Sequence, residues 1–415
     1  MGDNDTVVAA AASGLEFVRD PTMGVLRAAG IVGGFGQALT GAAGSLLAFE
    51  VSGSESTAGL PQTALVAGSA AAAAILSRLA VPFGRRRTLA AGAGVAMAGS
   101  LIVTAGALTS SLVLILAGCV LLGAGTASVM LGRYAAAELA PEAMRPKAMA
   151  SILTATTIGA IAGPNLLAPA SLAAVGLGIP ALAGPFALGT LAFALYAVML
   201  IAGLRDTRPA TRAAAAATEP DRIASAAPGL AVLAVTNLVM VAVMTMAPVH
   251  LGHNGTGLTM IGVVISVHIA GMFAPAPLSA WLVQRIGAAP TAALAGWAMA
   301  GACALAAAGA SSSLTLAIAM AALGAGWNLG LVSGSAMLTA SVPRAVRLKR
   351  EGWGEVGMGV AAAAGGLACG PLVAQGGYVA LAFAGAVAAA LIPSLVAASG
   401  RPRRRERRPL TNGVP

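Results

Sequence analysis

Charged residues are scarce in this chain of 415 residues, of which only 9% are Asp, Glu, Lys or Arg. Soluble domains carry about 25% charge, so this shortage excludes an ordinary soluble enzyme. Cysteine is also rare, and Cys119, Cys303 and Cys369 show no paired spacing that would indicate a disulfide framework or a zinc site. A Walker phosphate loop and a dinucleotide glycine fingerprint are both missing. We therefore expect no cofactor, no metal and no direct drive by ATP.

Apolar residues, in contrast, make up 58% of the chain. A membrane-spanning helix needs about 20 mostly apolar residues, so the composition allows about twelve spans. The charges mark their places: two charge-free gaps of 22 residues each hold one helix, and five gaps of 45 to 62 residues each hold two. The sequence thus predicts an all-α membrane protein with twelve transmembrane helices. The predicted spans are 28–50, 61–81, 88–108, 112–133, 149–170, 179–203, 229–249, 260–283, 290–309, 313–335, 357–376 and 378–398.

The distribution of charge also predicts the orientation. An even number of spans puts both termini on one side of the membrane. If that side is the cytoplasm, all 24 Lys and Arg lie in or beside cytoplasmic segments, and only Glu50 and Glu55 are charged outside. This pattern follows the positive-inside rule. We expect a multi-pass protein of the plasma (inner) membrane of a prokaryote with both termini cytoplasmic. The acidic residues of the first 20 positions argue against a cleavable signal peptide.

The net charge of +10 is concentrated partly at the C-terminus, where residues 401–408 include six arginines. Such a tail is expected to contact anionic lipids of the inner leaflet. Nucleic-acid binding requires aromatic or groove-reading features as well as charge, and none is present. We therefore expect a small-molecule substrate and the lipid bilayer as partners, no nucleic acid, and a monomer.

The chain divides into two similar halves. The longest polar interruption, 205–228, separates six predicted spans from six and has the composition of a flexible linker. Leu-Gly-Ala-Gly, which starts at Leu122, recurs at Leu323, and Gly-x-x-x-Gly-Pro, which starts at Gly159, recurs at Gly366. The near-constant offset predicts two pseudo-symmetric halves. The expected organisation is a cytoplasmic arm 1–24, six helices in 25–204, a cytoplasmic linker 205–228, six helices in 229–399 and a basic cytoplasmic tail 400–415.

This organisation resembles the major facilitator superfamily, whose substrate path lies between the halves near the bilayer midplane. The segment after the second predicted span is similar to the family signature Gly-x-x-x-Asp-Arg-x-Gly-Arg-Arg, with matches at Gly84, Arg85 and Arg86. Val81 stands where the signature has its acid, and Gln284 stands there in the second half. Since that acid helps to latch the cytoplasmic gate in the family, the resemblance implies a weaker or different latch.

The fifth span resembles the Gly-Pro signature of proton-driven exporters of this superfamily, with matches at Gly159, Gly163 and Pro164. Pro164 removes a backbone donor and bends the helix, whereas the two glycines allow a neighbouring helix to approach closely. We expect a pivot here, which favours export over import. The eleventh span has a similar pattern at Gly370 and Pro371. The alternative is ordinary packing, since Gly and Pro are common in membrane helices.

Ionisable residues deep within the spans are normally the proton sites of coupled carriers, and here His268 is the candidate. It either carries a proton or donates one hydrogen bond to a neighbouring helix as a neutral ring. A second pattern, His250-x-x-His253, lies in a predicted outer loop without a third ligand and predicts no metal site. At the inner end of the fourth span, Arg133 is expected to pair with Glu138 or a helix terminus at the cytoplasmic gate, or to extend toward the membrane surface.

Polar residues within the spans are the remaining candidates for substrate contacts. In the family that the chain resembles, spans 1, 4, 7 and 10 line the cavity. Each amide or hydroxyl in hydrocarbon needs a hydrogen-bond partner, either another helix or a substrate. The candidates are Gln37, Thr40, Asn165, Asn237, Trp327 and Asn328.

The sequence therefore predicts a secondary transporter with alternating access, and not an enzyme. We expect efflux of a small hydrophobic drug or metabolite by proton antiport. One alternative is an importer or uniporter of an uncharged solute, which fits the scarcity of charge in the spans. The other is an integral-membrane enzyme that modifies lipids, although the 14 acids are scattered rather than clustered as such enzymes require.

Overall fold

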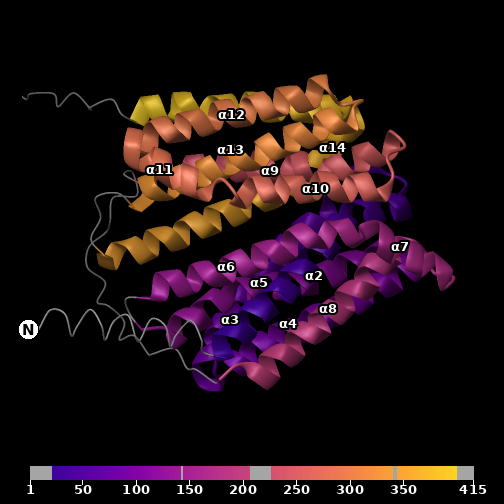
Figure 1. Cartoon of the computed structure of the whole chain (residues 1–415). Helices are drawn as coiled ribbons and strands as arrows, with labels where there is room; N and C mark the ends of the chain where they lie inside the picture. Colours follow the sequence, from indigo (N-terminus) through magenta and orange to yellow (C-terminus); the bar gives the residue numbers. More distant parts are fainter. Residues whose placement is uncertain (1–20, 142–143, 206–225, 340–343, 400–415) are drawn as a thin grey trace, which may run out of the picture.

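The computed structural model describes residues 21–141, 144–205, 226–339 and 344–399, which form helices and contain no strand. Most of the predicted arm, linker and tail lies outside these residues, at positions 1–20, 206–225 and 400–415. Eleven helical segments are long and apolar enough to cross a membrane. They pack as two bundles, the first indigo to magenta and the second pink to yellow in Figure 1.

The first bundle begins earlier than predicted. Its first helix already includes residues 21–27, ahead of the predicted span, because the proline at position 21 suits the first turn of a helix. Its elements are α2 (Pro21–Ser52), η1 (Glu55–Thr57), α3 (Leu60–Phe83), α4 (Arg85–Leu108), α5 (Leu112–Leu139), α6 (Arg145–Ala162), η3 (Gly163–Leu166), α7 (Leu167–Gly176) and α8 (Ala183–Gly203). The predicted disturbance at Pro164 is present, since the short turn η3 separates α6 from α7.

The first helix of the second bundle is longer than predicted. The sequence predicts that a span stops at residue 249, whereas α9 continues to His253 and ends just before Gly255, whose φ of 75° leaves the helical region. His250 and His253 therefore lie on a helix and not in a loop. The elements are α9 (Ala227–His253), α10 (Leu258–Phe273), α11 (Ala276–Ile286), α12 (Ala288–Ala308), α13 (Ser313–Thr339) and α14 (Arg344–Ser399).

The last element, α14, crosses the membrane twice. It contains 56 residues, and a straight helix of that length would be about 84 Å long, far more than the roughly 30 Å of bilayer hydrocarbon. Gly377 breaks it with a φ of 72° and a ψ of 175°. Ten segments that cross once and one that crosses twice give twelve spans. The predicted twelve-helix all-α membrane fold is confirmed.

Glycines with positive φ show that the two halves repeat each other. The described residues contain six of them, and they fall into three pairs: Gly53 with Gly255, Gly84 with Gly287, and Gly178 with Gly377. Gly84 and Gly287 even share nearly the same backbone angles, φ 81° and ψ 162° against φ 93° and ψ 162°. A side chain would be strained at such angles, so the glycine of the family-like signature is required by the turn that follows spans two and eight.

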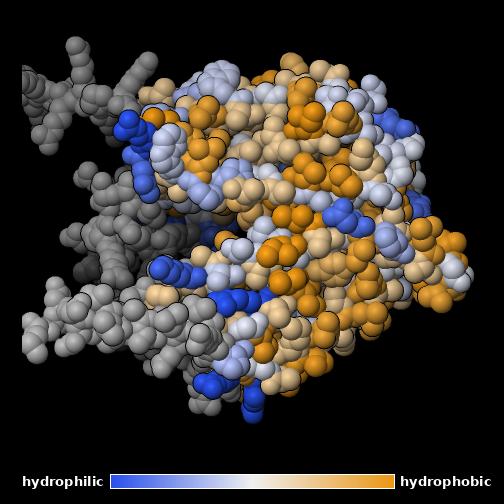
Figure 2. All heavy atoms as spheres, in the orientation of Figure 1, coloured by the Kyte–Doolittle hydropathy of each residue, from blue (hydrophilic) through white to orange (hydrophobic). Residues whose placement is uncertain are grey.

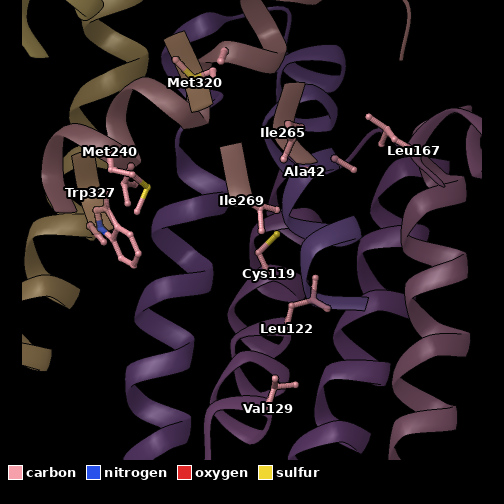
Figure 3. Packing of buried hydrophobic residues seen from close by; sticks show 14 of the residues in the cluster. Ala42, Cys119, Leu122, Val129, Leu167, Met240, Ile265, Ile269, Met320 and Trp327 are labelled. Carbon is pink, nitrogen blue, oxygen red and sulfur yellow. The ribbon is translucent and has the colours of Figure 1, made fainter. Parts of the chain in front are cut away.

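The interior of the bundles is apolar and its lipid-facing surface is apolar as well. Figure 3 shows Cys119, Leu122 and Val129 along α5, each 2% exposed. On the outside, Val113 and Leu177 are more than three-quarters exposed, and orange residues of this kind cover much of the surface in Figure 2. Exposed apolar area on this scale fits contact with lipid rather than with water.

The two ends of the molecule differ. At the end that carries Glu55 and His253, here called the closed end, the bundles contact each other through α14 with α3 and η1, and through α10 with η3. The opposite end, here called the basic end, carries Arg85 and Arg285. Figure 2 shows the surface hollowed between the two bundles toward the basic end.

Candidate functional site

Asn237 links three helices of the second bundle near the middle of their length. Its amide oxygen accepts a hydrogen bond from Nε1 of Trp327 on α13 at 3.0 Å, and its amide nitrogen donates to the carbonyl of Met358 on α14 at 2.8 Å. The Trp327 ring meets Phe273 of α10 edge-on, with centroids 6.3 Å apart, and lies near Met240 in Figure 3. Two predicted substrate residues, Asn237 and Trp327, are thus brought together beside aromatic and thioether groups.

Asn328 has a different environment from Trp327 although the two are adjacent. It is 3% exposed, accepts a hydrogen bond from Ser279 of α11 at 2.5 Å and donates to the carbonyl of Met272 on α10 at 2.7 Å. Pro275 follows Met272 and interrupts the helix between α10 and α11, so Asn328 satisfies a carbonyl near that break. Its amide oxygen and nitrogen are both used in helix packing and leave no group for a substrate.

In the first bundle, Gln37 and Thr40 also differ in whether their polar atoms are already used by hydrogen bonds within the protein. The Gln37 side chain is half-buried on α2, and its Oε1 is buried without a hydrogen-bond partner among the described residues. Thr40 donates to the carbonyl of Gly36 on its own helix at 2.9 Å and packs against Gly189 of α8. Gln37 therefore retains an acceptor for a substrate, whereas Thr40 has the environment of a packing residue.

His268 lies inside the second bundle and is completely buried. Its Nδ1 is 2.8 Å from the carbonyl oxygen of Met320 on α13. Its Nε2 is buried and has no hydrogen-bond partner among the described residues. The predicted bond to a neighbouring helix is present, and the second ring nitrogen is the atom available to take a proton.

Asn165 lies at the closed end, between the two bundles. Its amide donates to the hydroxyl of Ser266 on α10 at 2.8 Å, and Ser266 donates to the carbonyl of Ile161 on α6 at 2.8 Å. Close by, a Cβ at Gly262 of α10 would overlap the carbonyl oxygen of Pro164. The break at Pro164 is therefore a contact between the halves, and Asn165 is a residue of that contact instead of the central site.

The glycines of the eleventh span form the other contact at the closed end. Gly366 packs against Thr63 of α3, and Gly370 packs against the backbone carbonyl of Glu55 in η1. The Thr63 hydroxyl also donates to the carbonyl of Ala363 at 3.3 Å. Pro371 follows Gly370 directly in α14.

The matching glycines of the fifth span, Gly159 and Gly163, pack within their own bundle. A Cβ at Gly159 would overlap the carbonyl oxygen of Ile31 on α2, and Gly163 lies against Phe35 of the same helix. The predicted close approach of a neighbouring helix is therefore present. Its partner is α2, whereas Gly366 and Gly370 use the repeated pattern to contact the other half.

A contact between a histidine and a glutamate that the sequence does not predict also joins the halves. Nδ1 of His253 on α9 lies 3.2 Å from Oε1 of Glu55 in η1. Phe49 of α2 meets the His253 ring edge-on, with centroids 4.6 Å apart. Within the described chain no group of three or more His, Cys, Asp or Glu is placed to hold a metal ion. The sequence did carry a signal for this contact. Glu50 and Glu55, the only charges predicted outside the membrane, share the predicted outer side with His250 and His253.

At the basic end, Glu138 interacts with a different arginine from the one predicted. Nη2 of Arg85 lies 2.9 Å from Glu138 Oε1, and its Nε donates to the same oxygen at 3.1 Å. Arg133 instead lies over the ring of Tyr134, 5.1 Å from its centroid. The reason is geometric, because α4 begins beside the end of α5 and presents Arg85 to Glu138. Arg86 is half-buried next to this pair.

Comparison with known proteins identifies the family. The family model described as Major Facilitator Superfamily matches residues 27–291. The uncharacterized MFS-type transporter YddS of Bacillus subtilis (strain 168) is 36% identical over 391 residues, covering 90% of each chain. The riboflavin transporter RfnT of Brucella anthropi is 26% identical over 276 residues, covering 65% of this chain and 68% of RfnT.

Solved structures of other transporters share the fold. The crystal structure of the nucleoside transporter NupG superposes with a TM-score of 0.74 at 13% identity, covering 92% of this chain and all of the NupG chain. The family model and the homologues indicate a transporter rather than an enzyme, and the predicted resemblance is confirmed. The chain belongs to the Major Facilitator Superfamily and is a multi-pass membrane transporter.

Proposed function

We propose that this transporter works by alternating access and moves a small, uncharged and largely apolar solute. The observation that carries the proposal is the asymmetry of the two ends: the bundles contact each other at the closed end and are hollowed between them toward the basic end. The polar groups near the middle are neutral, namely the Asn237 and Trp327 pair and the Gln37 amide. A charged solute would lose its hydration there without gaining an opposite charge.

The basic end faces the cytoplasm in this proposal. Arg85 and Arg285 lie at that end, and positive charge is retained on the cytoplasmic side of membrane proteins. The structure then corresponds to the state that is open to the inside. In the opposite state, the contacts of Asn165 with Ser266 and of Gly366 with Thr63 separate.

Export by proton antiport is the first mode that we propose. The fifth span has the Gly-Pro pattern of exporters, and its break at Pro164 lies in a contact between the halves, where a pivot would act. In this mode the proton binds Nε2 of His268, which has no hydrogen-bond partner among the described residues.

Uniport or import of an uncharged solute is the second mode. It is favoured by the complete burial of His268 within the second bundle, away from solvent in this state. Riboflavin, a solute with a flat ring system, is a suitable first probe because one relative is named as a riboflavin transporter. An aromatic corner such as that of Trp327 and Phe273 is well suited to contact a flat ring.

The test is transport by the purified protein in vesicles under an imposed pH gradient. Riboflavin and a panel of hydrophobic antibiotics are supplied, and both solute flux and internal pH are recorded. Solute movement that drives a proton the opposite way supports antiport. Solute movement without a change in proton flux contradicts antiport and supports uniport. A growth-protection screen in an efflux-deficient host widens the panel, since export of a toxic compound raises the tolerated dose.

A further inference from the structure

The two sides of the closed end are joined by a contact between a histidine and a carboxylate. His253 is the last residue of α9 in the second bundle, and Glu55 begins η1 in the first. Their side chains are 39% and 26% exposed, and the atoms that face each other, Nδ1 and Oε1, are 3.2 Å apart. Water therefore reaches the pair, and the charge of the imidazole follows the pH on that side of the membrane.

His253 lies at the C-terminal end of α9, beside a carboxylate of the other half. The free carbonyls at the C-terminus of a helix carry partial negative charge, which attracts a cation. The charged and titratable groups of the elements around it are Glu55 of η1, Glu50 near the end of α2, His250 on α9 itself, and Tyr378 of α14, whose ring stacks on His250. Two of these are carboxylates, and His250 is directed away, toward Ala310 and Tyr378 of its own bundle.

The other contacts described here between the halves at the closed end are neutral. Thr63 donates to the Ala363 carbonyl, Asn165 donates to Ser266, and Gly59 packs against the carbonyl of Gly366. Hydroxyls, amides and carbonyls keep their hydrogen bonds between about pH 5 and 8, since none of them titrates there. A change of pH in this range therefore acts on the His253 and Glu55 contact.

We propose that Glu55 and His253 form a pH-sensitive latch of the closed end, which acid on that side fastens and neutral to alkaline pH releases. The proposal rests on the alternation and orientation proposed above. The sign follows from the chemistry: the charge attraction needs the imidazolium, which is present at low pH and is lost as the pH rises past the range in which histidine titrates. An exposed ion pair changes such an equilibrium by about two- to fivefold.

The chain contains its own reporter of the closed end. Cys369 of α14 is fully buried, and its Sγ faces Gly59 across the contact between the halves. Opening of the closed end exposes this thiol to the outside. Cys119 and Cys303 are buried within α5 and α12, each inside one bundle. Replacing both by alanine leaves Cys369 as the thiol that reports opening.

The experiment measures labelling of Cys369 by a membrane-impermeant maleimide added from outside to cells that express the full chain. The Cys119→Ala, Cys303→Ala protein serves as wild type, and the Glu55→Gln and His253→Gln variants are made in it. All are compared at each pH, so that the pH dependence of the reagent itself cancels. At pH 6 we expect wild type to label about two- to fivefold more slowly than either variant. At pH 8 the three rates converge, because the wild-type histidine is then neutral. His250→Gln, one turn away, is the matched control and follows wild type at both values.

Two results would overturn the latch: equal rates of wild type and Glu55→Gln at pH 6, or a difference that is as large at pH 8 as at pH 6. A third variant distinguishes failure of the latch from failure of the proposed alternating access. Gly59→Trp cannot close against Gly366, so it holds the closed end open and gives full labelling if the halves alternate. If Cys369 stays unlabelled even in Gly59→Trp, alternation at this end is contradicted, and the latch with it.

Discussion

Nδ1 of His268 faces the carbonyl oxygen of Met320 at 2.8 Å. A carbonyl oxygen can only accept a hydrogen bond, so Nδ1 carries the hydrogen and the neutral ring has its lone pair at Nε2. Nε2 is buried without a partner within the described part of the chain. The same contact therefore fixes the tautomer and leaves Nε2 as the ring atom with a free lone pair.

His268→Asn is expected to separate coupling from structure. The asparagine amide reaches the Met320 carbonyl as Nδ1 does, but it does not titrate near neutral pH. We expect a pH gradient to drive no transport in this variant while solute exchange across the vesicle membrane continues. His268→Ala also loses the hydrogen bond and is expected to cost about 1–3 kcal/mol of stability, measured by thermal unfolding. Unchanged pH dependence in His268→Asn would show that coupling does not use this residue.

Trp327→Phe is expected to weaken solute binding. The change removes the indole N–H and leaves Oδ1 of the half-buried Asn237 without its donor, which costs about 0.5–1.5 kcal/mol. We expect a lower melting temperature and a solute affinity that falls by about fivefold or more. Trp297→Phe is the control, since Trp297 is 60% exposed on α12. Equal losses in the two variants would mean that Trp327 has no special role.

Gly159→Ala is expected to destabilise the first bundle. Its methyl group would overlap the carbonyl oxygen of Ile31, so α6 must move away from α2. Overpacking of this kind costs about 1–3 kcal/mol. Gly94→Ala on α4 is the matched control, because no atom lies within 4 Å of a Cβ at that position. Thermal unfolding in detergent measures both, and a Gly159→Ala protein as stable as Gly94→Ala would contradict the packing described here.

Pro164→Ala is expected to slow turnover with little loss of binding. The alanine supplies the missing backbone N–H and allows a continuous helix through η3, which stiffens the proposed pivot. Transport rate and solute affinity are measured separately in vesicles. Pro169→Ala, at an exposed position near the start of α7, is the control. A parallel loss of rate and affinity would indicate that Pro164 serves packing alone.

The site was only partly predictable from sequence. Asn237 and Asn328 look alike in the sequence, since each is an amide in an apolar span. The structure places Asn237 beside Trp327 and uses the whole amide of Asn328 to join α10, α11 and α13. Which of the two remains near the substrate path depends on how each helix is rotated about its axis. That rotation is set by packing against helices that are distant in the sequence.

The sequence by itself determined the number of spans, indicated the two halves and marked Gly84 as a glycine of the family-like signature. These features depend on local chemistry: an apolar run of fixed length crosses the bilayer, and a positive φ requires glycine. Only the tertiary structure decided that Glu55 meets His253 and that Arg85, not Arg133, meets Glu138. Such pairs form where close helix packing and the placement of the two bundles bring distant residues together, and hydropathy along one chain carries no record of that placement.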